Sequence, residues 1–287
     1  MPRINEMGGV LGRYILHFLV KYVGIWTIRL ITFPVVCYYM IVFPKIRNHS
    51  MKYWSTLFPG QSRMKYLKQI YRHYATFGET LVDRLNPLIQ VDNKDSDLLV
   101  KNEIQNRHGI ILLCSHVGGY NFYRFNLGNQ LVHIMMYGSE EERNKSQFTM
   151  FDRSNETNIC FINTMEANVI FKLHDILEGK GIIAIMGDRT TDHSKRHNKK
   201  VNLTGLEVTI PLSPWYLAYN TGAVIIVSFI IKKNRNQYHY ITKEPIRLSP
   251  VEGRKKRDVI DQAISCYIDH LKEVILEYPD QWFNFRN

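Results

Sequence analysis

The residues best placed to do chemistry are Ser115 and His116, which follow an apolar run at residues 110–114. Five apolar residues without alternation are typical of a strand that is buried on both faces. Gly118 and Gly119 come soon after and allow the backbone to turn tightly. Ligands of open α/β sheets bind beyond the carboxyl ends of the strands. His116 therefore stands where a general base is expected, the alternative being an ordinary surface histidine at the end of a strand.

A second polar cluster follows another apolar run, residues 182–186. Gly187 frees the backbone there, and Asp188 and Arg189 follow it directly. An acidic and a basic side chain thus stand at the end of a buried strand, where ligands of open α/β sheets bind. The alternative is a local ion pair between Asp188 and Arg189.

A basic segment comes next and contains Lys195, Arg196, Lys199 and Lys200. Beside a strand-end site in a basic protein, these side chains are candidates to bind phosphates or an acidic carrier protein. Charge runs are also common in solvated loops, so both interpretations stay open.

Strands and helices alternate along the rest of the chain. Strands are expected at residues 110–116, 131–137, 159–163, 182–186 and 224–231, with an edge strand at 238–241. Helical periodicity is found at residues 64–85, 120–127, 140–151, 167–177, 215–220 and 259–278. This alternation predicts an α/β fold with a mainly parallel central sheet flanked by helices.

The N-terminal part of the chain differs from the rest. Arg13, His17 and Lys21 share one helical face, and apolar side chains occupy the opposite face. Such a helix is suited to a membrane interface. The apolar run at residues 30–43 contains Pro34 and is shorter than the roughly 20 residues that span a bilayer. We therefore expect a membrane-embedded anchor rather than a transmembrane helix; a buried soluble helix pair is the alternative.

The predicted domains are a membrane-anchoring helical segment, residues 1–45, and an α/β domain, residues 46–287. The chain is 45% hydrophobic and carries a net charge of +11, which excludes a disordered chain and favours anionic partners. No nucleic-acid-binding motif is apparent, so anionic lipid or an acidic carrier protein is expected instead. The four cysteines have no metal or disulfide spacing, which is typical of a reducing compartment.

Residues 115–121, S-H-V-G-G-Y-N, resemble the S-H-x-G-N-x-E segment of the late lipid A (lauroyl/myristoyl-type) acyltransferase branch of the lysophospholipid acyltransferase superfamily. The superfamily motif is a histidine, four residues, and then Asp or Glu. His116 matches it, whereas Asn121 stands at the acidic position. G-D-R at residues 187–189 and P-D-Q-W at 279–282 resemble further family motifs in the same order, so the resemblance runs over most of residues 66–285.

The resemblance implies that His116 is the catalytic base and that Asn121 orients its ring. The Asn121 amide oxygen can accept a hydrogen bond but supplies no negative charge. In a serine protease triad, an Asp→Asn change costs about 10⁴ in turnover. Three readings follow: the enzyme is slow, it uses Asp188 instead, or it transfers a more reactive acyl group.

The implied function is that of a membrane-associated acyltransferase at the cytoplasmic face of the bacterial inner membrane. It would move an acyl group from acyl carrier protein or acyl-CoA to a hydroxyl or amine of a lipid or other hydrophobic acceptor, with no metal or other cofactor. The candidate substrate-binding residues are Gly187, Asp188, Arg189, Lys195 and Arg196. The main alternative is a lipid-binding homologue that has lost catalysis through Asn121. A soluble hydrolase is disfavoured because the chain has no G-x-S-x-G elbow.

Overall fold

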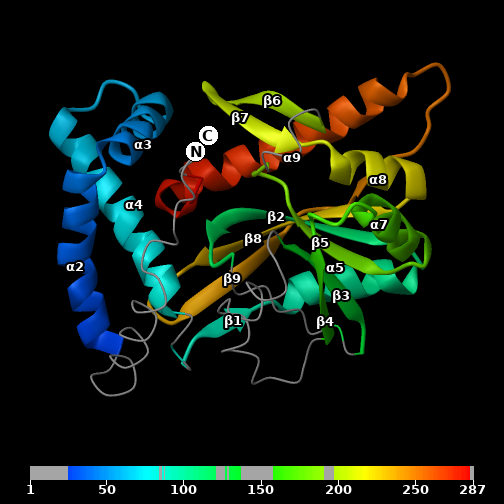
Figure 1. Ribbon diagram of the computed structural model, residues 1–287, viewed down its shortest axis with the longest axis horizontal. Coiled ribbons are helices and arrows are strands. Elements are labelled where there is room, and N and C mark those ends of the chain that lie inside the picture. The colour runs from blue at the N-terminus through cyan, green and yellow to red at the C-terminus, as the bar shows by residue number, and fades with distance from the viewer. Residues whose placement is uncertain are drawn as a thin grey trace. The chain divides into compact units, whose positions relative to one another are not determined.

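The computed structural model describes residues 25–83, 86, 88–120, 127, 129–136, 158–190 and 197–284 (Figure 1). The chain divides into two compact units, Met1–Ile89 and Gln90–Asn287. The first unit is helical and the second contains the sheet. The predicted division of function at residue 45 stays a prediction.

The second unit is built on an eight-stranded sheet in the order β1-β9-β8-β2-β5-β3-β4, with β10 paired to β8. All its pairings are parallel except those of β8 with β9 and β10. The strands are β1 (Gln90–Asp92), β2 (Ile110–Gly118), β3 (Leu131–Met136), β4 (Asn158–Asn163), β5 (Ile182–Met186), β8 (Val224–Lys232), β9 (Gln237–Thr242) and β10 (Ile246–Arg247). The mainly parallel sheet predicted from the sequence is therefore confirmed.

Helices flank this sheet, as the alternating pattern predicted. In Figure 1, α9 runs along one side of the sheet and α5 lies on the other. The helices of this unit are α5 (Lys94–Gln105), α7 (Val169–Glu178), α8 (Ser213–Thr221), α9 (Lys256–Glu277) and the 3₁₀ turn η3 (Pro279–Gln281). A separate hairpin consists of β6 (Asn198–Leu203) and β7 (Leu206–Pro211). The helices expected at 120–127 and 140–151 lie largely outside the described residues.

Two sequence predictions for the sheet are wrong. Strand β9 is not an edge strand, because the short β1 pairs with its outer side. Strand β2 does not end at His116 but continues to Gly118, because the long β8 and the C-terminal segment offer further pairing. Both differences come from partners that are distant in the sequence.

The core of the sheet lies in β2, β5 and β8. Every residue of β2 is buried, and so is every residue of β8 except Lys232. Burying one such aliphatic side chain contributes roughly 1.5–3 kcal/mol. These strands are thus a rigid support for whatever side chains emerge at their carboxyl ends.

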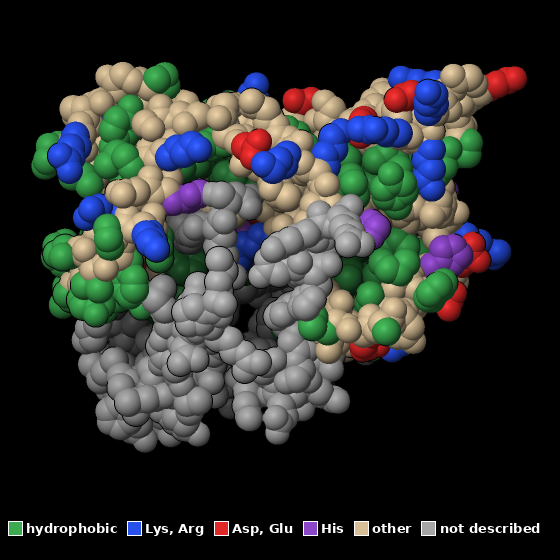
Figure 2. Space-filling model, turned by 45° about the horizontal axis from the view of Figure 1, so that its top comes forward, with side chains coloured by type: hydrophobic (Ala, Val, Ile, Leu, Met, Phe, Trp, Pro, Cys, Tyr) green, Lys and Arg blue, Asp and Glu red, His purple; other side chains and the backbone are tan. Residues whose placement is uncertain are grey.

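The surface of the protein is basic, in keeping with its net charge of +11. Lys and Arg side chains are spread over the upper part of the face in Figure 2. Two lysines of the basic segment are paired with acids: Lys199 lies 2.6 Å from Asp261, and Lys200 lies 2.7 Å from Glu207. These two lysines are therefore partly neutralised, which weakens their case as ligands for an anion.

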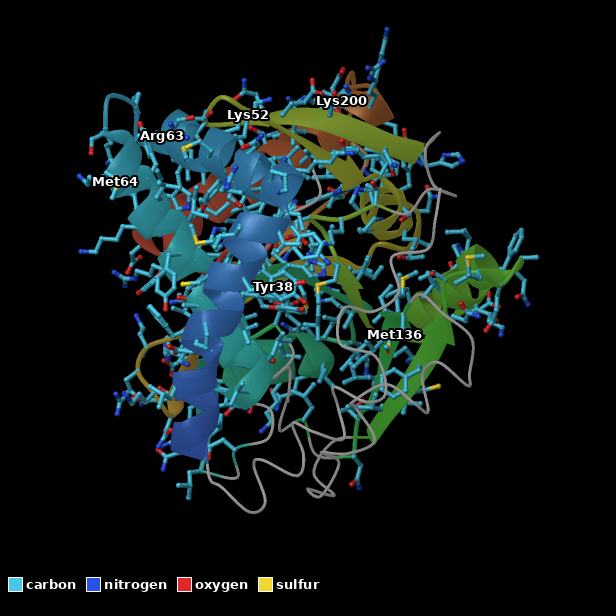
Figure 3. The ribbon with its side chains drawn as sticks, turned by 60° about the vertical axis from the view of Figure 1, so that its left-hand side comes forward. Tyr38, Lys52, Arg63, Met64, Met136 and Lys200 are labelled. Atoms are coloured by element: carbon cyan, nitrogen blue, oxygen red, sulfur yellow. The ribbon has the colours of Figure 1, made fainter. Side chains whose placement is uncertain are left out.

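The described residues of the first unit form α2 (Ile25–Val42), α3 (Pro44–Leu57) and α4 (Arg63–Asp83). Pro44 is the first residue of α3, a position where a proline loses no hydrogen bond. Helix α2, on which Tyr38 is labelled in Figure 3, exposes a set of large hydrophobic side chains. They are Leu30, Phe33, Val35, Tyr38, Ile41 and Val42. Among the helices that the structure describes, none has the length and apolar character to cross a bilayer.

Candidate active site

His116 is presented at an irregularity in β2. Strand β2 keeps regular register with β8 as far as Cys114, and the register then shifts before Gly118 pairs with Ile230. Gly118 has a φ of +51°, and a Cβ there would lie 2.1 Å from the Ile230 carbonyl oxygen. Only glycine fits this position, because both the backbone conformation and the close approach exclude a side chain. The bulge thus places His116 at the edge of the sheet where its parallel strands have their carboxyl ends.

Asp188 reaches His116 from the neighbouring strand. Strands β2 and β5 are parallel, with Cys114 opposite Met186, so the residues that follow both strands meet at one edge of the sheet. Gly187 allows this close packing, since a Cβ there would lie 3.0 Å from the Leu113 side chain and from the Tyr267 hydroxyl. The Asp188 carboxylate is fully buried directly behind His116.

Two hydrogen bonds join the two residues, which we call the His116–Asp188 pair. Nδ1 of His116 lies 2.7 Å from Oδ1 of Asp188, and the backbone N–H of His116 donates to Oδ2 at 2.9 Å. The 72 residues between them are bridged by the sheet. His116 is 8% exposed, so it is not the ordinary surface histidine considered as the alternative.

The charge state of Asp188 determines the tautomer of His116. Burial alone would raise the pKa of Asp188, but the positive charge and hydrogen bonds of His116, together with Arg189, lower that pKa below its ordinary value. An ionised carboxylate only accepts hydrogen bonds, so Nδ1 must carry the proton. In the neutral form of the ring, Nε2 therefore has the lone pair, and no described residue hydrogen-bonds to it. This is the state of an imidazole that can act as a base.

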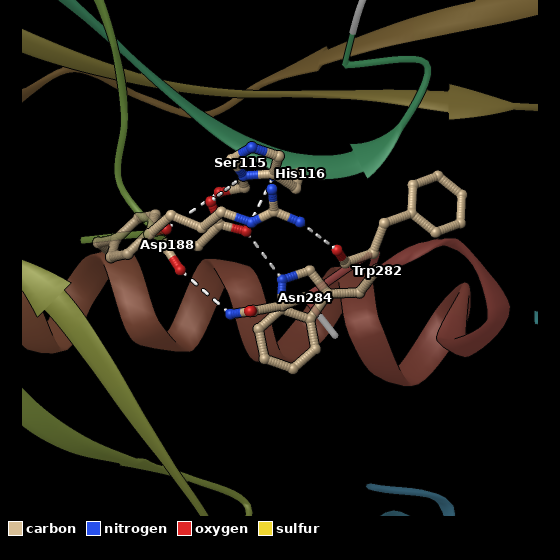
Figure 4. A network of polar contacts seen from close by, with 8 residues as sticks. Ser115, His116, Asp188, Trp282 and Asn284 are labelled. Carbon is tan, nitrogen blue, oxygen red and sulfur yellow. Dashed lines mark hydrogen bonds and ion pairs between the residues drawn. The ribbon is translucent and has the colours of Figure 1, made fainter. Parts of the chain in front are cut away.

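The C-terminal segment, residues 282–284, holds Asp188 from the other side (Figure 4). The indole Nε1 of Trp282 donates to Oδ2 of Asp188 at 3.0 Å. The side-chain amide of Asn284 donates to the backbone oxygen of Asp188 at 3.1 Å. Both residues are buried. Side chain and backbone of Asp188 are therefore both tied to this segment.

The same segment is also joined to the neighbours of Asp188. The backbone N–H of Phe283 donates to the His116 carbonyl at 2.7 Å. The Arg189 guanidinium donates to the Phe283 carbonyl at 2.6 Å. The guanidinium of Arg189 is thus engaged in a hydrogen bond within the protein, and its role in binding substrate stays a prediction.

A hydroxyl pair lies behind the His116–Asp188 pair. Ser115 Oγ and the Tyr267 hydroxyl are 3.0 Å apart, and both residues are fully buried. Burial raises the pKa of Tyr267 well above its ordinary value, and the charge of Asp188 adds to this. Tyr267 is therefore a neutral phenol that ties α9 to β2.

The structure brings together four of the seven site residues expected from the sequence: His116, Gly187, Asp188 and Arg189. Asn121, Lys195 and Arg196 lie outside the described residues. Sequence reasoning missed the contacts of Trp282, Asn284 and Tyr267 with this site. The P-D-Q-W motif marked the first of these, but nothing local connects it to a strand far earlier in the chain. In the part of the chain that the structure describes, no group of three His, Cys, Asp or Glu residues could hold a metal ion.

Comparison with known proteins identifies a family for this chain. A sequence model described as bacterial lipid A biosynthesis acyltransferase matches residues 85–287, which include every residue of the His116 site. A search of curated proteins gave no match. The family match supports acyl transfer to a lipid as the general class of reaction. The chain therefore belongs to the bacterial lipid A biosynthesis acyltransferase family.

Proposed function

We propose that this protein is a membrane-associated acyltransferase of the late, lauroyl/myristoyl-type branch, in which His116 is the general base and Asp188 is its acidic partner. The donor is a thioester, either acyl carrier protein or acyl-CoA. The acceptor is a hydroxyl or amine of a lipid. The observation that carries the proposal is the 2.7 Å contact of Nδ1 with a buried, ionised carboxylate, within the region matched by the family.

The reaction follows from the tautomer of His116. Nε2 takes the proton of the acceptor hydroxyl as its oxygen attacks the thioester carbonyl carbon. Asp188 stabilises the imidazolium that forms, as the aspartate of a catalytic triad does. The C–S bond then breaks, the new ester bond remains, and the imidazolium returns its proton to the departing thiolate. No metal or redox group is required in this sequence of steps.

The contact with Asp188 supports catalysis even though Asn121 stands at the acidic position of the family motif. A lipid-binding homologue without catalysis was the main alternative because Asn121 carries no charge. Asp188 supplies that charge to the ring from another strand. We therefore prefer an active enzyme, and assign Asp188 to the acid partner rather than to substrate binding.

Membrane association at the cytoplasmic face of the inner membrane is proposed for the N-terminal part. The exposed side chains of α2 support it, since Leu30 and Ile41 are each 74% exposed and Phe33 is 59% exposed. Apolar side chains exposed together on one helix mark an interaction surface. A lipid acceptor also requires the enzyme to work at a membrane, which makes lipid the favoured partner of this surface.

An acyl-transfer assay tests the proposal. The full-length protein in detergent is mixed with lipid A precursor and with acyl carrier protein or CoA thioesters, and products are detected by mass spectrometry. We expect the wild type and His174→Ala, an exposed histidine on α7, to form acylated lipid, and His116→Ala to form none. Transfer by His116→Ala at the wild-type rate would exclude this mechanism. Absence of product with the wild type and every donor would favour the lipid-binding homologue.

A further inference from the structure

Trp282 makes a contact that the reaction proposed above does not use. Its side chain is 3% exposed, and its backbone forms an isolated bridge with Val117, the residue after His116. Its indole N–H points at Oδ2 of Asp188 at 3.0 Å (Figure 4). The indole therefore lies on the side of the carboxylate that does not meet the imidazole ring.

Both oxygens of Asp188 are thereby fixed. Oδ1 accepts from the His116 ring, and Oδ2 accepts from the His116 backbone and from Trp282. The terminal torsion of an aspartate is otherwise broad, so a carboxylate with fewer donors samples more orientations. Removing the indole N–H takes away one of the donors that hold Oδ2.

Trp282 is itself firmly held. It follows η3, whose Gln281 side chain accepts from the Lys232 backbone N–H at 2.8 Å and donates to the Lys232 carbonyl at 3.0 Å. On its other side, Phe283 donates to the His116 carbonyl. These bonds connect the C-terminal segment to β8 and β2. The position of the indole is therefore fixed by the sheet.

We propose that Trp282 is a positioning residue for acyl transfer: its indole N–H holds the Asp188 carboxylate in the orientation that serves His116. This inference rests on the proposed function. Besides Trp282, the groups that face Asp188 are His116 from β2, the adjacent Arg189, and Tyr267 from α9. His116 donates to both carboxylate oxygens, and Trp282 donates to Oδ2.

The kinetic test compares two Trp→Phe variants. Trp282→Phe keeps an aromatic ring and removes the donor. Trp54→Phe is the matched control, since Trp54 is also 3% exposed but its Nε1 has no hydrogen-bond partner among the described residues. We expect Trp282→Phe to lower kcat about 10-fold to 100-fold, the effect of losing a hydrogen bond to a charged group, with KM unchanged. Trp54→Phe is expected to keep both constants near the wild-type values.

A second measurement does not depend on activity. In proton NMR of the full-length protein in detergent, the Nδ1–H of His116 should give a far-downfield signal because it is bonded to a carboxylate at 2.7 Å. Trp282→Phe should shift this signal and speed its exchange with water, whereas Trp54→Phe should not. The indole signal of Trp282 should in turn move upfield in Asp188→Asn.

The outcomes separate the two proposals. If the wild type transfers no acyl group but the His116 signal changes only in Trp282→Phe, then the acyltransferase proposal fails and the positioning role stands. If Trp282→Phe keeps the wild-type kcat and an unchanged His116 signal, the positioning role is wrong even though transfer occurs. If Trp282→Phe does not fold, it shows no cooperative thermal unfolding transition. The Trp282 indole signal in Asp188→Asn then tests the positioning role: an upfield shift supports it, and an unchanged signal contradicts it.

Discussion

Nδ1 of His116 lies 2.7 Å from the carboxylate of Asp188, a residue 72 positions later in the chain. The carboxylate is fully buried and its pKa is lowered, so the contact joins an imidazole to a negative charge. Within the family motif the acidic position is occupied by Asn121. Asp188, which follows the neighbouring strand β5, brings a negative charge to the His116 ring that Asn121 cannot supply.

The first prediction concerns Asn121, which lies outside the described residues. Because Asp188 already fixes the His116 ring, Asn121→Ala should retain acyl transfer within about tenfold of the wild type, far from the 10⁴-fold loss of a triad that lacks its acid. Steady-state rates with a saturating thioester donor measure this. A loss as large as that of His116→Ala would instead make Asn121 the working partner.

The second prediction is a pH dependence of stability. The pKa of Asp188 is lower in the folded protein than its ordinary value of 3.8, so its ionisation stabilises the fold above that pH. This stabilisation is lost as the pH falls through the folded pKa. The difference in free energy of unfolding between the wild type and Asp188→Asn should therefore shrink as the pH falls below the ordinary value of 3.8 and through the folded pKa.

Urea unfolding at a series of pH values provides the measurement. The control is Asp95→Asn, an exposed aspartate on α5, whose difference from the wild type should be small throughout. A difference for Asp188→Asn that stays the same down to pH 3 would contradict the account of its ionisation.

The third prediction concerns the exposed face of α2. Replacing Leu30, Phe33 and Ile41 by glutamine should move protein from the membrane fraction to the soluble fraction. Exposed side chains can be replaced with little effect on folding, whereas burial of three such groups in lipid is worth several kcal/mol. Leu98→Gln and Phe171→Gln, which change exposed hydrophobic residues of the second unit, serve as the control and should leave the distribution unchanged. If both sets of substitutions left the same share of protein in the membrane fraction, α2 would not be the membrane-binding element.

The fourth prediction concerns Lys195 and Arg196, which also lie outside the described residues. If they bind an anionic donor or acceptor, Lys195→Glu with Arg196→Glu should raise KM at low salt, and the effect should fade as salt screens the charges over about 10 Å at 0.1 M. Lys94→Glu with Lys101→Glu makes the same change in charge on α5 and should leave KM unaltered. An unchanged KM in both pairs at low salt would identify a solvated loop.

Local patterns predicted β2, β3, β4, β5, β8 and β9 and the helices α7, α8 and α9, but not α5, the hairpin of β6 and β7, or the short strands β1 and β10. Continuous apolar runs identified β2, β5 and β8, and glycines identified the turns beside His116 and Asp188. The sequence also placed both residues at strand ends, and the parallel pairing of β2 with β5 then brings them together. These features depend on side chains close to one another in the sequence.

What sequence reasoning missed depends on distant parts of the chain. The extension of β2 to Gly118 requires β8 and Trp282 as partners, and the interior place of β9 requires the three-residue strand β1. Trp282 itself was visible only as part of a motif. Its hydrogen bond to Asp188 spans 94 residues, and no periodicity or spacing reports such a contact.

The central claim is that His116 and Asp188 act as one unit, and a double-mutant comparison tests it most directly. Single-turnover rates of acyl transfer are measured for His116→Ala, Asp188→Asn and the double variant. We expect Asp188→Asn to lose about 10⁴ in rate, and the double variant to be no slower than His116→Ala, because residues of one catalytic unit have non-additive effects. Transfer by Asp188→Asn at the wild-type rate, or losses that multiply in the double variant, would contradict the claim.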